Sequence, residues 1–248
     1  GRGHQQGELK RRSDRSAEPA ARAMLSEAAG RGKALSETDS KRILACYGIA
    51  IPREILARDP EQAALAAGRI GGPVAIKVVS PDILHKTEAG GVRLGLSTPE
   101  NVREAAKNIF ASALRFAPQA RIDGISVQQM APSGTEIVLG IKNDRQFGPL
   151  IAAGLGGIMV ELLADTAVRL APVYDQTARE MLASLKGHAL LTGFRGKPGV
   201  DIDALVETIC RLSELAHDLR DVIDQIDVNP LIASTNGVLA ADALIVCR

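Results

Sequence analysis

The stretch Ile226-Asp227-Val228-Asn229-Pro230-Leu231 alternates apolar and polar residues, which predicts a β-strand over residues 225–231. The dipeptide Asn236-Gly237 that follows is typical of a hairpin turn, and residues 238–247 predict the returning strand. Together they predict a two-stranded antiparallel ribbon near the C-terminus.

Three oxygen-bearing side chains share one face of this ribbon. With Asn236-Gly237 as the turn, Leu231 is opposite Asp242 and Asn229 is diagonal to it. Because residues i and i+2 share a face, Asp227 points the same way as Asn229. Diagonal neighbours are about 7–8 Å apart, so two such oxygens can meet on one Mg²⁺ ion, which prefers carboxylate and carbonyl ligands. Pro230 is a candidate bulge in this register.

Length and composition restrict the class of protein. The 248 residues suffice for one large domain or for two smaller lobes. A net charge of +1 and an aromatic content of 2% disfavour a nucleic-acid partner, which needs a basic face or a stacking platform. The core must consist of Ala, Val, Ile and Leu, a composition that suits parallel or mixed sheets covered by helices.

The cysteines and the apolar runs indicate a compartment. Cys46, Cys210 and Cys247 are scattered and odd in number, which disfavours a zinc site and a disulfide framework and indicates a reducing environment. No apolar run approaches the roughly 20 residues that span a bilayer, and no signal-peptide pattern is present. We therefore expect a cytoplasmic protein without a membrane partner.

The pattern of elements divides the chain into three parts. Residues 1–25 are expected to be a disordered arm or linker, because the first twenty are polar without a periodic apolar face. Residues 26–131 alternate predicted strands and helices and form a first α/β lobe. Residues 132–248 begin with consecutive predicted strands and form a second, α+β lobe with a largely antiparallel sheet.

Common nucleotide motifs do not occur in the sequence. Gly30-Arg31-Gly32-Lys33 is followed by Ala34 and follows no predicted strand, so it is not a P-loop. Neither a GxGxxG fingerprint nor a GxSxG elbow is present. A nucleotide site would have to be built in another way.

Lys77 lies inside the apolar run Val74-Ala75-Ile76-Lys77-Val78-Val79. A lysine in a buried strand is unfavourable without a partner. Two interpretations stay open: a lysine that binds phosphate, or a lysine on a strand edge whose ammonium group reaches water.

Two loops could approach an anion. The first contains His85 and Gly90-Gly91, where the glycines allow close backbone approach and His85 could accept a phosphoryl group. Taken alone, this loop is better explained as a surface turn. The second loop, residues 193–198, contains Arg195 and two glycines. It could bind phosphate, or it could be an ordinary connection between helices. Gly154-Leu155-Gly156-Gly157 marks either tight turns or backbone approach to a ligand.

In order, these blocks resemble the ATP-grasp domain of the NDP-forming acyl-CoA synthetases. This family includes the ADP-forming acetate–CoA ligases and is related to the succinyl-CoA synthetase β subunit. The resemblance covers residues 26–248, and the order and spacing of the blocks make it specific. The blocks are residues 32–37 with 47–49, 74–79, 85–92, 147–149, 154–157 with 160–161, 193–198, and 227–231 with 242.

The resemblance implies an ATP-grasp fold of two lobes with ATP held between them, and Mg²⁺ as the cofactor. It implies that one lysine contacts the phosphates and that a hinge between the lobes holds adenine and ribose. The residues that it assigns to the nucleotide are Lys77, Gln128, Gln129, Met130 and Glu136, and those that it assigns to Mg²⁺ are Asn229 and Asp242.

The reaction that the resemblance implies converts carboxylate, CoA and ATP to acyl-CoA, ADP and phosphate through an acyl phosphate and a phosphohistidine. His85 would take the phosphoryl group, since imidazole is neutral and available near pH 7. Phosphoryl transfer depends mainly on positioning and charge neutralisation, so Arg195 and Lys77 would supply positive charge around the phosphate.

The sequence departs from the family pattern in two ways. Gln129 stands where a glutamate is expected at the hinge. The CoA-binding and ligase domains, which carry the other active-site histidine, are missing, so we expect a CoA-binding domain or α-type subunit as partner, in an oligomeric enzyme. The alternative is a regulatory, ligand-sensing ATP-grasp-like region of a protein acetyltransferase. Gln129 favours that alternative weakly, whereas His85, Lys77, Asn229 and Asp242 disfavour it.

Overall fold

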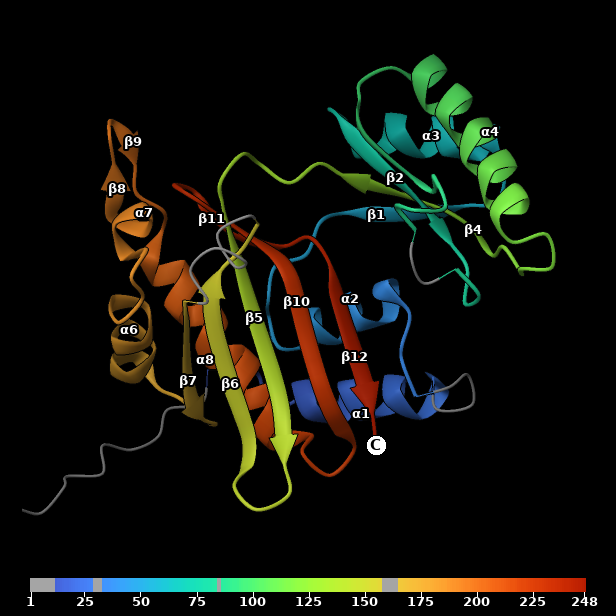
Figure 1. Ribbon diagram of the computed structural model, residues 1–248. Helices are drawn as coiled ribbons and strands as arrows, with labels where there is room; N and C mark the ends of the chain where they lie inside the picture. The colour runs from blue at the N-terminus through green and yellow to red at the C-terminus, as the bar shows by residue number, and fades with distance from the viewer. Residues whose placement is uncertain (1–11, 29–32, 84–85, 158–164) are drawn as a thin grey trace, which may run out of the picture. The chain divides into compact units, whose positions relative to one another are not determined.

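A computed structural model describes residues 12–28, 33–83, 86–157 and 165–248. The chain divides into two compact units (Figure 1). The smaller unit is Pro52–Ala131, and the larger unit combines the segments before and after it. Each unit packs helices against an antiparallel sheet. The antiparallel sheet expected for the second lobe is confirmed, whereas the parallel or mixed sheets expected from the composition were wrong, because every strand pairing in the described residues is antiparallel.

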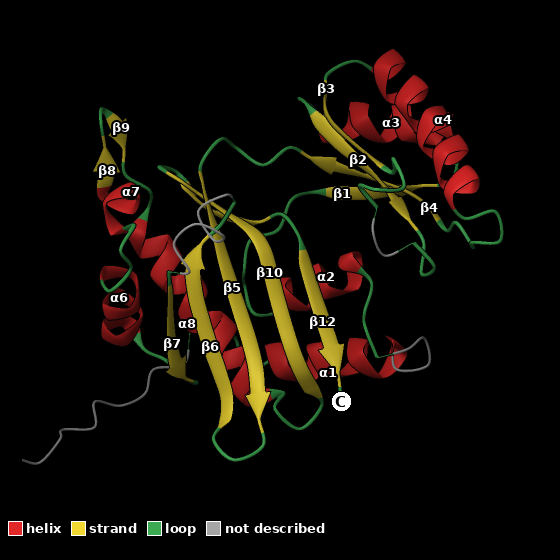
Figure 2. Cartoon of the chain, viewed as in Figure 1, coloured by secondary structure: helices red, strands yellow, loops and turns green. Residues whose placement is uncertain are grey.

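The smaller unit has a four-stranded sheet in the order β1-β4-β2-β3, and all of its pairings are antiparallel. Helices α3 and α4 lie on one face of it (Figure 2). Both helices begin at side-chain caps, since Asp59 accepts from the Gln62 N–H and Thr98 from the Asn101 N–H. The elements are β1 (Glu54–Ala57), α3 (Pro60–Ile70), β2 (Val74–Val79), β3 (Val92–Leu96), α4 (Pro99–Phe116) and β4 (Gly124–Gln129).

Alternation along the strands places the apolar core of the smaller unit under its helices. Ile76 of β2 and Val127 of β4 are directly opposite each other and fully buried. They belong to the same cluster as Val102 and Ile109 of α4. Residues 77, 126 and 128 therefore lie on the face opposite α3 and α4.

The larger unit is built on a six-stranded antiparallel sheet in the order β11-β10-β5-β6-β7, with β12 also paired to β10. Helices α1, α2 and α8 lie behind this sheet in Figure 1. The strands are β5 (Thr135–Asp144), β6 (Gly148–Leu155), β7 (Thr166–Leu170), β10 (Ile223–Ser234), β11 (Gly237–Ala240) and β12 (Ala243–Cys247), with a short ribbon of β8 (Gly193–Phe194) and β9 (Lys197–Pro198). The helices are α1 (Ala17–Ala28), α2 (Glu37–Cys46), α6 (Asp175–Ala183), α7 (His188–Thr192) and α8 (Ile202–Asp218).

The N-terminal part differs from the sequence-based expectation. Helix α1 occupies much of the segment that was expected to be an arm, although residues 1–11 lie outside the described residues. Ala17, Ala21 and Leu25 are buried in the core of the larger unit. This stripe has one apolar residue per turn, and the first two are small, so it is too narrow to stand out in a polar segment.

The boundary of the first lobe also differs. Helix α2 packs in the larger unit, where Ile43, Leu44 and Tyr47 are fully buried. The compact smaller unit therefore begins at Pro52 instead of residue 26, and it ends at Ala131, next to the expected boundary. Among the helices in the described parts of the chain, none is long and apolar enough to cross a membrane.

Candidate functional site

Strands β10 and β12 bring Asn229 and Asp242 together. The Asn229 N–H donates to the Asp242 carbonyl oxygen at 3.2 Å, and the Ala241 N–H donates to the Pro230 carbonyl oxygen at 3.0 Å. The register continues with Val228 opposite Ala243. Asn229 and Asp242 are therefore directly opposite each other, a position in which Cβ atoms are about 4.5–5.5 Å apart.

The predicted register was wrong by two residues. Ser234 pairs with Gly237, so Thr235 and Asn236 form the turn, and Leu231 lies opposite Ala240 instead of Asp242. The Ser234 hydroxyl accepts from the Asn236 N–H at 3.2 Å, which shapes the turn one residue earlier than Asn236-Gly237 predicted. The correction shortens the expected Asn229–Asp242 separation, because a diagonal pair becomes a direct one.

The predicted bulge at Pro230 is confirmed on the β5 side. The pairing of β10 with β5 shifts between Val228 and Leu231, where three steps along β10 match two steps along β5. Proline has no N–H to donate to a ladder, so the strand loses its regular pairing there. Asn229 consequently lies outside the β5 ladder, and it is exposed.

The three oxygen-bearing residues lie on one face of the sheet. Val228 and Ala243 are buried in the core on the side of α8, so Asp227, Asn229 and Asp242 lie on the opposite face. We call this the polar face of the larger unit. Burial raises the pKa of the half-buried Asp227 above its ordinary value. Two carboxylates and one amide oxygen match the small number of protein ligands that Mg²⁺ takes beside water and phosphates.

Glu136 of β5 lies on the same polar face, next to two glycines. The Gly156 N–H donates to the Glu136 carbonyl oxygen at 2.7 Å. A Cβ atom on Gly156 would lie 2.9 Å from the Glu136 Cβ, and one on Gly157 would lie 2.9 Å from the Glu136 Oε2. The glycine pair, which follows β6, therefore leaves the space that the Glu136 side chain occupies above the sheet.

A hollow of about 110 Å³ lies on the polar face, over β5 and β6. The floor is made by Gly140 of β5 and Ala152 of β6, which are directly opposite each other, and Gly140 also pairs with Asp227. Asp165 lines the hollow, is 9% exposed and accepts from the Gly187 N–H at 2.9 Å. Gly154, which the sequence marked as a possible point of backbone approach to a ligand, lines the hollow, whereas Gly140 was not singled out, although a glycine inside a strand is the same signal.

Arg195 lies at the tip of the β8–β9 ribbon, which stands beside α7 and apart from the main sheet (Figure 1). Phe194 pairs with Lys197, so Arg195 and Gly196 form a two-residue turn with positive φ angles of 50° and 79°. The guanidinium group lies 5.3 Å from the centroid of the Phe194 ring. The structure therefore places Arg195 on a different ribbon from Asn229 and Asp242.

In the smaller unit, Lys77 lies on an interior strand. Strand β2 runs between β4 and β3, so the interpretation of Lys77 as a strand-edge lysine is wrong. The side chain is half-buried on the face opposite α3 and α4, and it lies directly opposite Ser126 of β4. A lysine in such a position needs polar neighbours, and β4 provides them.

The three predicted hinge residues separate in the structure. Gln128 is 3% exposed and shares the face of Lys77, between Glu54 of β1 and Ala75 of β2. Gln129 is exposed, points to the other face, and its N–H donates to the Arg53 carbonyl oxygen at 2.8 Å. The Met130 N–H donates to the Pro73 carbonyl oxygen at 3.1 Å. Gln128 thus shares the face of Lys77, whereas Gln129 points to the other face.

His85 lies outside the described residues, and the glycines that follow it have a structural role. The Gly91 N–H donates to the Lys86 carbonyl oxygen at 2.7 Å, and a Cβ atom on Gly91 would lie 2.5 Å from a methyl carbon of Val78. Gly90 has a φ angle of 64°. The glycine pair therefore closes the loop tightly onto β2.

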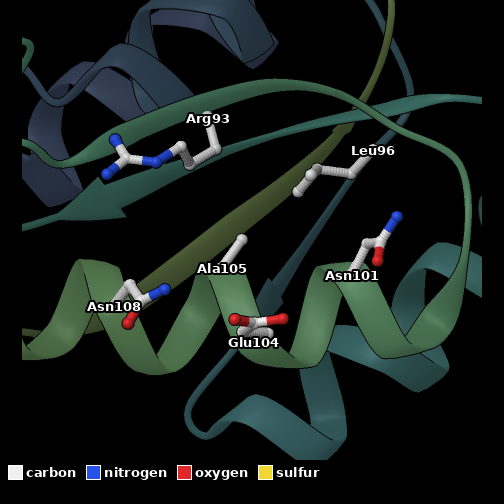
Figure 3. Close-up of a pocket in the computed structure, with 6 residues that line it drawn as sticks. All are labelled: Arg93, Leu96, Asn101, Glu104, Ala105 and Asn108. Carbon is white, nitrogen blue, oxygen red and sulfur yellow. The ribbon is translucent and has the colours of Figure 1, made fainter.

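A second hollow, of about 210 Å³, lies between β3 and α4 of the smaller unit (Figure 3). None of the predicted site residues lines it. Most of its polar side chains are exposed, and Arg93 donates to the backbone carbonyls of Gly90 and Val92. The lining consists of Arg93, Leu96, Asn101, Glu104, Ala105 and Asn108.

Comparison with known proteins agrees with these observations. Residues 26–247 match the family model of the ATP-grasp domain, so the chain belongs to this family, and the predicted resemblance is confirmed. The acetate–CoA ligase [ADP-forming] I subunit beta of Pyrococcus furiosus is 40% identical over 223 residues, which cover 90% of this chain and 96% of the relative. Within the ATP-grasp family, the chain is a homologue of the β subunits of ADP-forming acetate–CoA ligases.

Solved structures give the same result. Acetyl-coenzyme A synthetase 1 of Ca. Korarchaeum cryptofilum, in complex with coenzyme A, Ca-AMPCP and HgCl+, has a TM-score of 0.88 at 39% identity, covering 92% of this chain and 100% of that chain. Another structure of that protein contains coenzyme A and Mg-AMPPCP, with its phosphohistidine segment pointing towards the nucleotide binding site. It has a TM-score of 0.82 at 36% identity, with the same coverage.

Proposed function

We propose that this chain is the ATP-binding, phosphoryl-transferring component of an ADP-forming acyl-CoA ligase. The observation that carries the proposal is the direct opposition of Asn229 and Asp242 on the polar face, beside Asp227. These side chains provide the hard oxygens that a magnesium–nucleotide complex requires. The Mg-AMPPCP complex of the related synthetase supports a magnesium–nucleotide ligand.

Asn229 and Asp242 would hold Mg²⁺, which when bound neutralises negative charge on the transferring phosphates. Lys77, on the interior strand β2, would add a second positive charge for the phosphates. Gln128 and Glu136 would bind the base and the ribose, because a carboxamide both donates and accepts and a carboxylate accepts from hydroxyl groups. Gln129 and Met130 would contribute through their backbone carbonyl oxygens, because their N–H groups already donate to Arg53 and Pro73.

We assign the relay step to His85 on the basis of the sequence. A ring nitrogen of His85 would form a bond to the γ-phosphorus of ATP while the bond to the β–γ bridging oxygen breaks and ADP leaves. The exposed guanidinium of Arg195 would neutralise charge on the phosphoryl group. A CoA-binding domain or α-type subunit would complete the reaction, and the phosphohistidine segment of the related synthetase supports such a partner.

Calorimetric titration of the full chain with ADP tests the proposal. We expect binding that strengthens when Mg²⁺ is added and that weakens at least tenfold in Lys77→Ala, since a charge-assisted contact contributes roughly 1.5–3 kcal/mol. Lys142→Ala is the matched control, because Lys142 is an exposed lysine paired with Asp224 at 2.6 Å. Equal ADP affinity in the wild type and in Lys77→Ala would contradict the assignment of Lys77, and absence of ADP binding would contradict the function.

A further inference from the structure

Four polar side chains form a block on the sheet of the smaller unit, on the face opposite α3 and α4. Glu54 of β1 lies opposite Gln128 of β4, and Ser126 of β4 lies opposite Lys77 of β2. Ser126 is 7% exposed and Gln128 is 3% exposed. Buried polar groups are unfavourable unless they bond to one another, so this block has a defined internal arrangement.

The Ser126 hydroxyl connects the two charged members of the block. It donates to the Glu54 Oε2 at 3.3 Å. A hydroxyl has one proton to donate and two lone pairs that accept. Ser126 also lies directly opposite Lys77, so its hydroxyl is carried by the strand between those of Glu54 and Lys77.

We propose that Glu54, acting through Ser126, positions the ammonium group of Lys77 for the phosphates of the nucleotide. The proposal rests on the function proposed above, in which Lys77 contacts phosphate. Directly opposite residues have Cβ atoms about 4.5–5.5 Å apart, which places the Ser126 hydroxyl beside the stem of Lys77. Glu54 and Ser126 are positioning residues in this arrangement, and neither touches the nucleotide.

The benefit of positioning follows from the flexibility of lysine. A free lysine side chain loses up to about 2 kcal/mol of rotamer entropy when it is fixed. Fixing it before the ligand arrives removes part of that loss from the binding step. Glu54 and Lys77 lie on β1 and β2, with β4 and its Ser126 between them, so the carboxylate acts on the lysine through the hydroxyl.

The test compares a ligand with phosphates and one without them. We expect Glu54→Gln and Ser126→Ala to weaken ADP binding by roughly three- to tenfold, the size of one hydrogen bond, and to leave adenosine binding unchanged. Ser126→Thr keeps the hydroxyl and should restore ADP affinity. Glu61→Gln is the matched control in the same unit, because Glu61 pairs with Arg103 at 2.7 Å on an exposed helix.

Other results of these titrations would overturn either the positioning role or the proposed function. An unchanged ADP affinity in Glu54→Gln and Ser126→Ala, with a large loss in Lys77→Ala, overturns the positioning role and leaves the proposed function intact. No loss in Lys77→Ala overturns the assignment of Lys77 and the positioning role with it, whereas absence of ADP binding in the wild type overturns the proposed function itself. Equal losses for ADP and adenosine show a purely structural effect and also overturn the positioning role.

Discussion

The carboxylate of Glu214 on α8 binds the segment that precedes α1. Glu214 accepts from the Arg12 N–H at 2.8 Å, from the Ser13 N–H at 3.0 Å and from the Ser13 hydroxyl at 2.5 Å. Ser13 is buried, and the Arg12 guanidinium pairs with Asp175 at 2.7 Å. These contacts predict that Glu214→Ala releases the segment before α1 and leaves the rest of the larger unit folded.

The magnitude follows from the number of lost bonds. A partly solvated hydrogen bond contributes about 1 kcal/mol, so three of them contribute about 3 kcal/mol to closing this segment. Each 1.4 kcal/mol is a factor of ten in an equilibrium constant, so the open population should rise roughly 100-fold. Global stability should change less, because terminal segments open locally without global unfolding.

Limited trypsin digestion under native conditions measures this opening as the rate of cleavage after Arg15. We expect that rate to rise roughly 100-fold in Glu214→Ala, when opening is fast compared with cleavage. The control is Asp203→Asn, which breaks a surface pair between Arg179 and an 82%-exposed carboxylate and should change the rate little. Equal cleavage rates in the two variants would refute the reasoning.

Three further predictions concern single residues. Burial raises the pKa of Asp227 above 3.8, so ionisation of Asp227 destabilises the folded state above that raised pKa and not below pH 3.8. Asp227→Asn should therefore raise the free energy of unfolding, measured in urea, at pH 7 but not at pH 3. An equal effect at both pH values would contradict the raised pKa. Gly124→Ala should destabilise the protein by about 2–3 kcal/mol, because φ is 148° and the new Cβ would lie 2.4 Å from the Ala57 carbonyl oxygen, whereas Gly68→Ala, with open space around it, should not. Burial raises the pKa of Cys210 to about 11, so its thiol should react with a disulfide reagent far more slowly than the half-exposed Cys46, and equal rates would argue against this burial.

The polar face of the larger unit could be predicted from the sequence because it depends on the alternation of apolar and polar residues within one strand. Alternation in residues 225–231 identified a strand and placed Asp227 with Asn229, and the antiparallel sheet followed from consecutive strands. The strand register could not be predicted in the same way. The Ser234 hydroxyl bonds the Asn236 N–H, so the turn lies one residue earlier than predicted and the strand pairing differs by two residues. A side chain that bonds its own turn is not visible in the apolar pattern.

Long-range packing explains the other differences. Helix α1 is stabilised by burial of Ala17 and Ala21 and by the pairing of Arg22 with Asp221, which lies 199 residues away. Likewise, the sequence selected Gln128 and Gln129 together, but only the strand pairing shows that their side chains lie on opposite faces. The polar block of Glu54 and Ser126 was missed because its members come from separate strands.

The central claim is that Asn229 and Asp242 form one metal–nucleotide site. Binding of Mn²⁺, followed by electron paramagnetic resonance with and without ADP, tests it most directly. The full chain should bind one Mn²⁺ ion in an ADP-dependent way, and Asp242→Ala should lose that ion, while Asp224→Asn, a control carboxylate on β10 paired with Lys142, should retain it. Undiminished ADP-dependent Mn²⁺ binding in Asp242→Ala would contradict the claim.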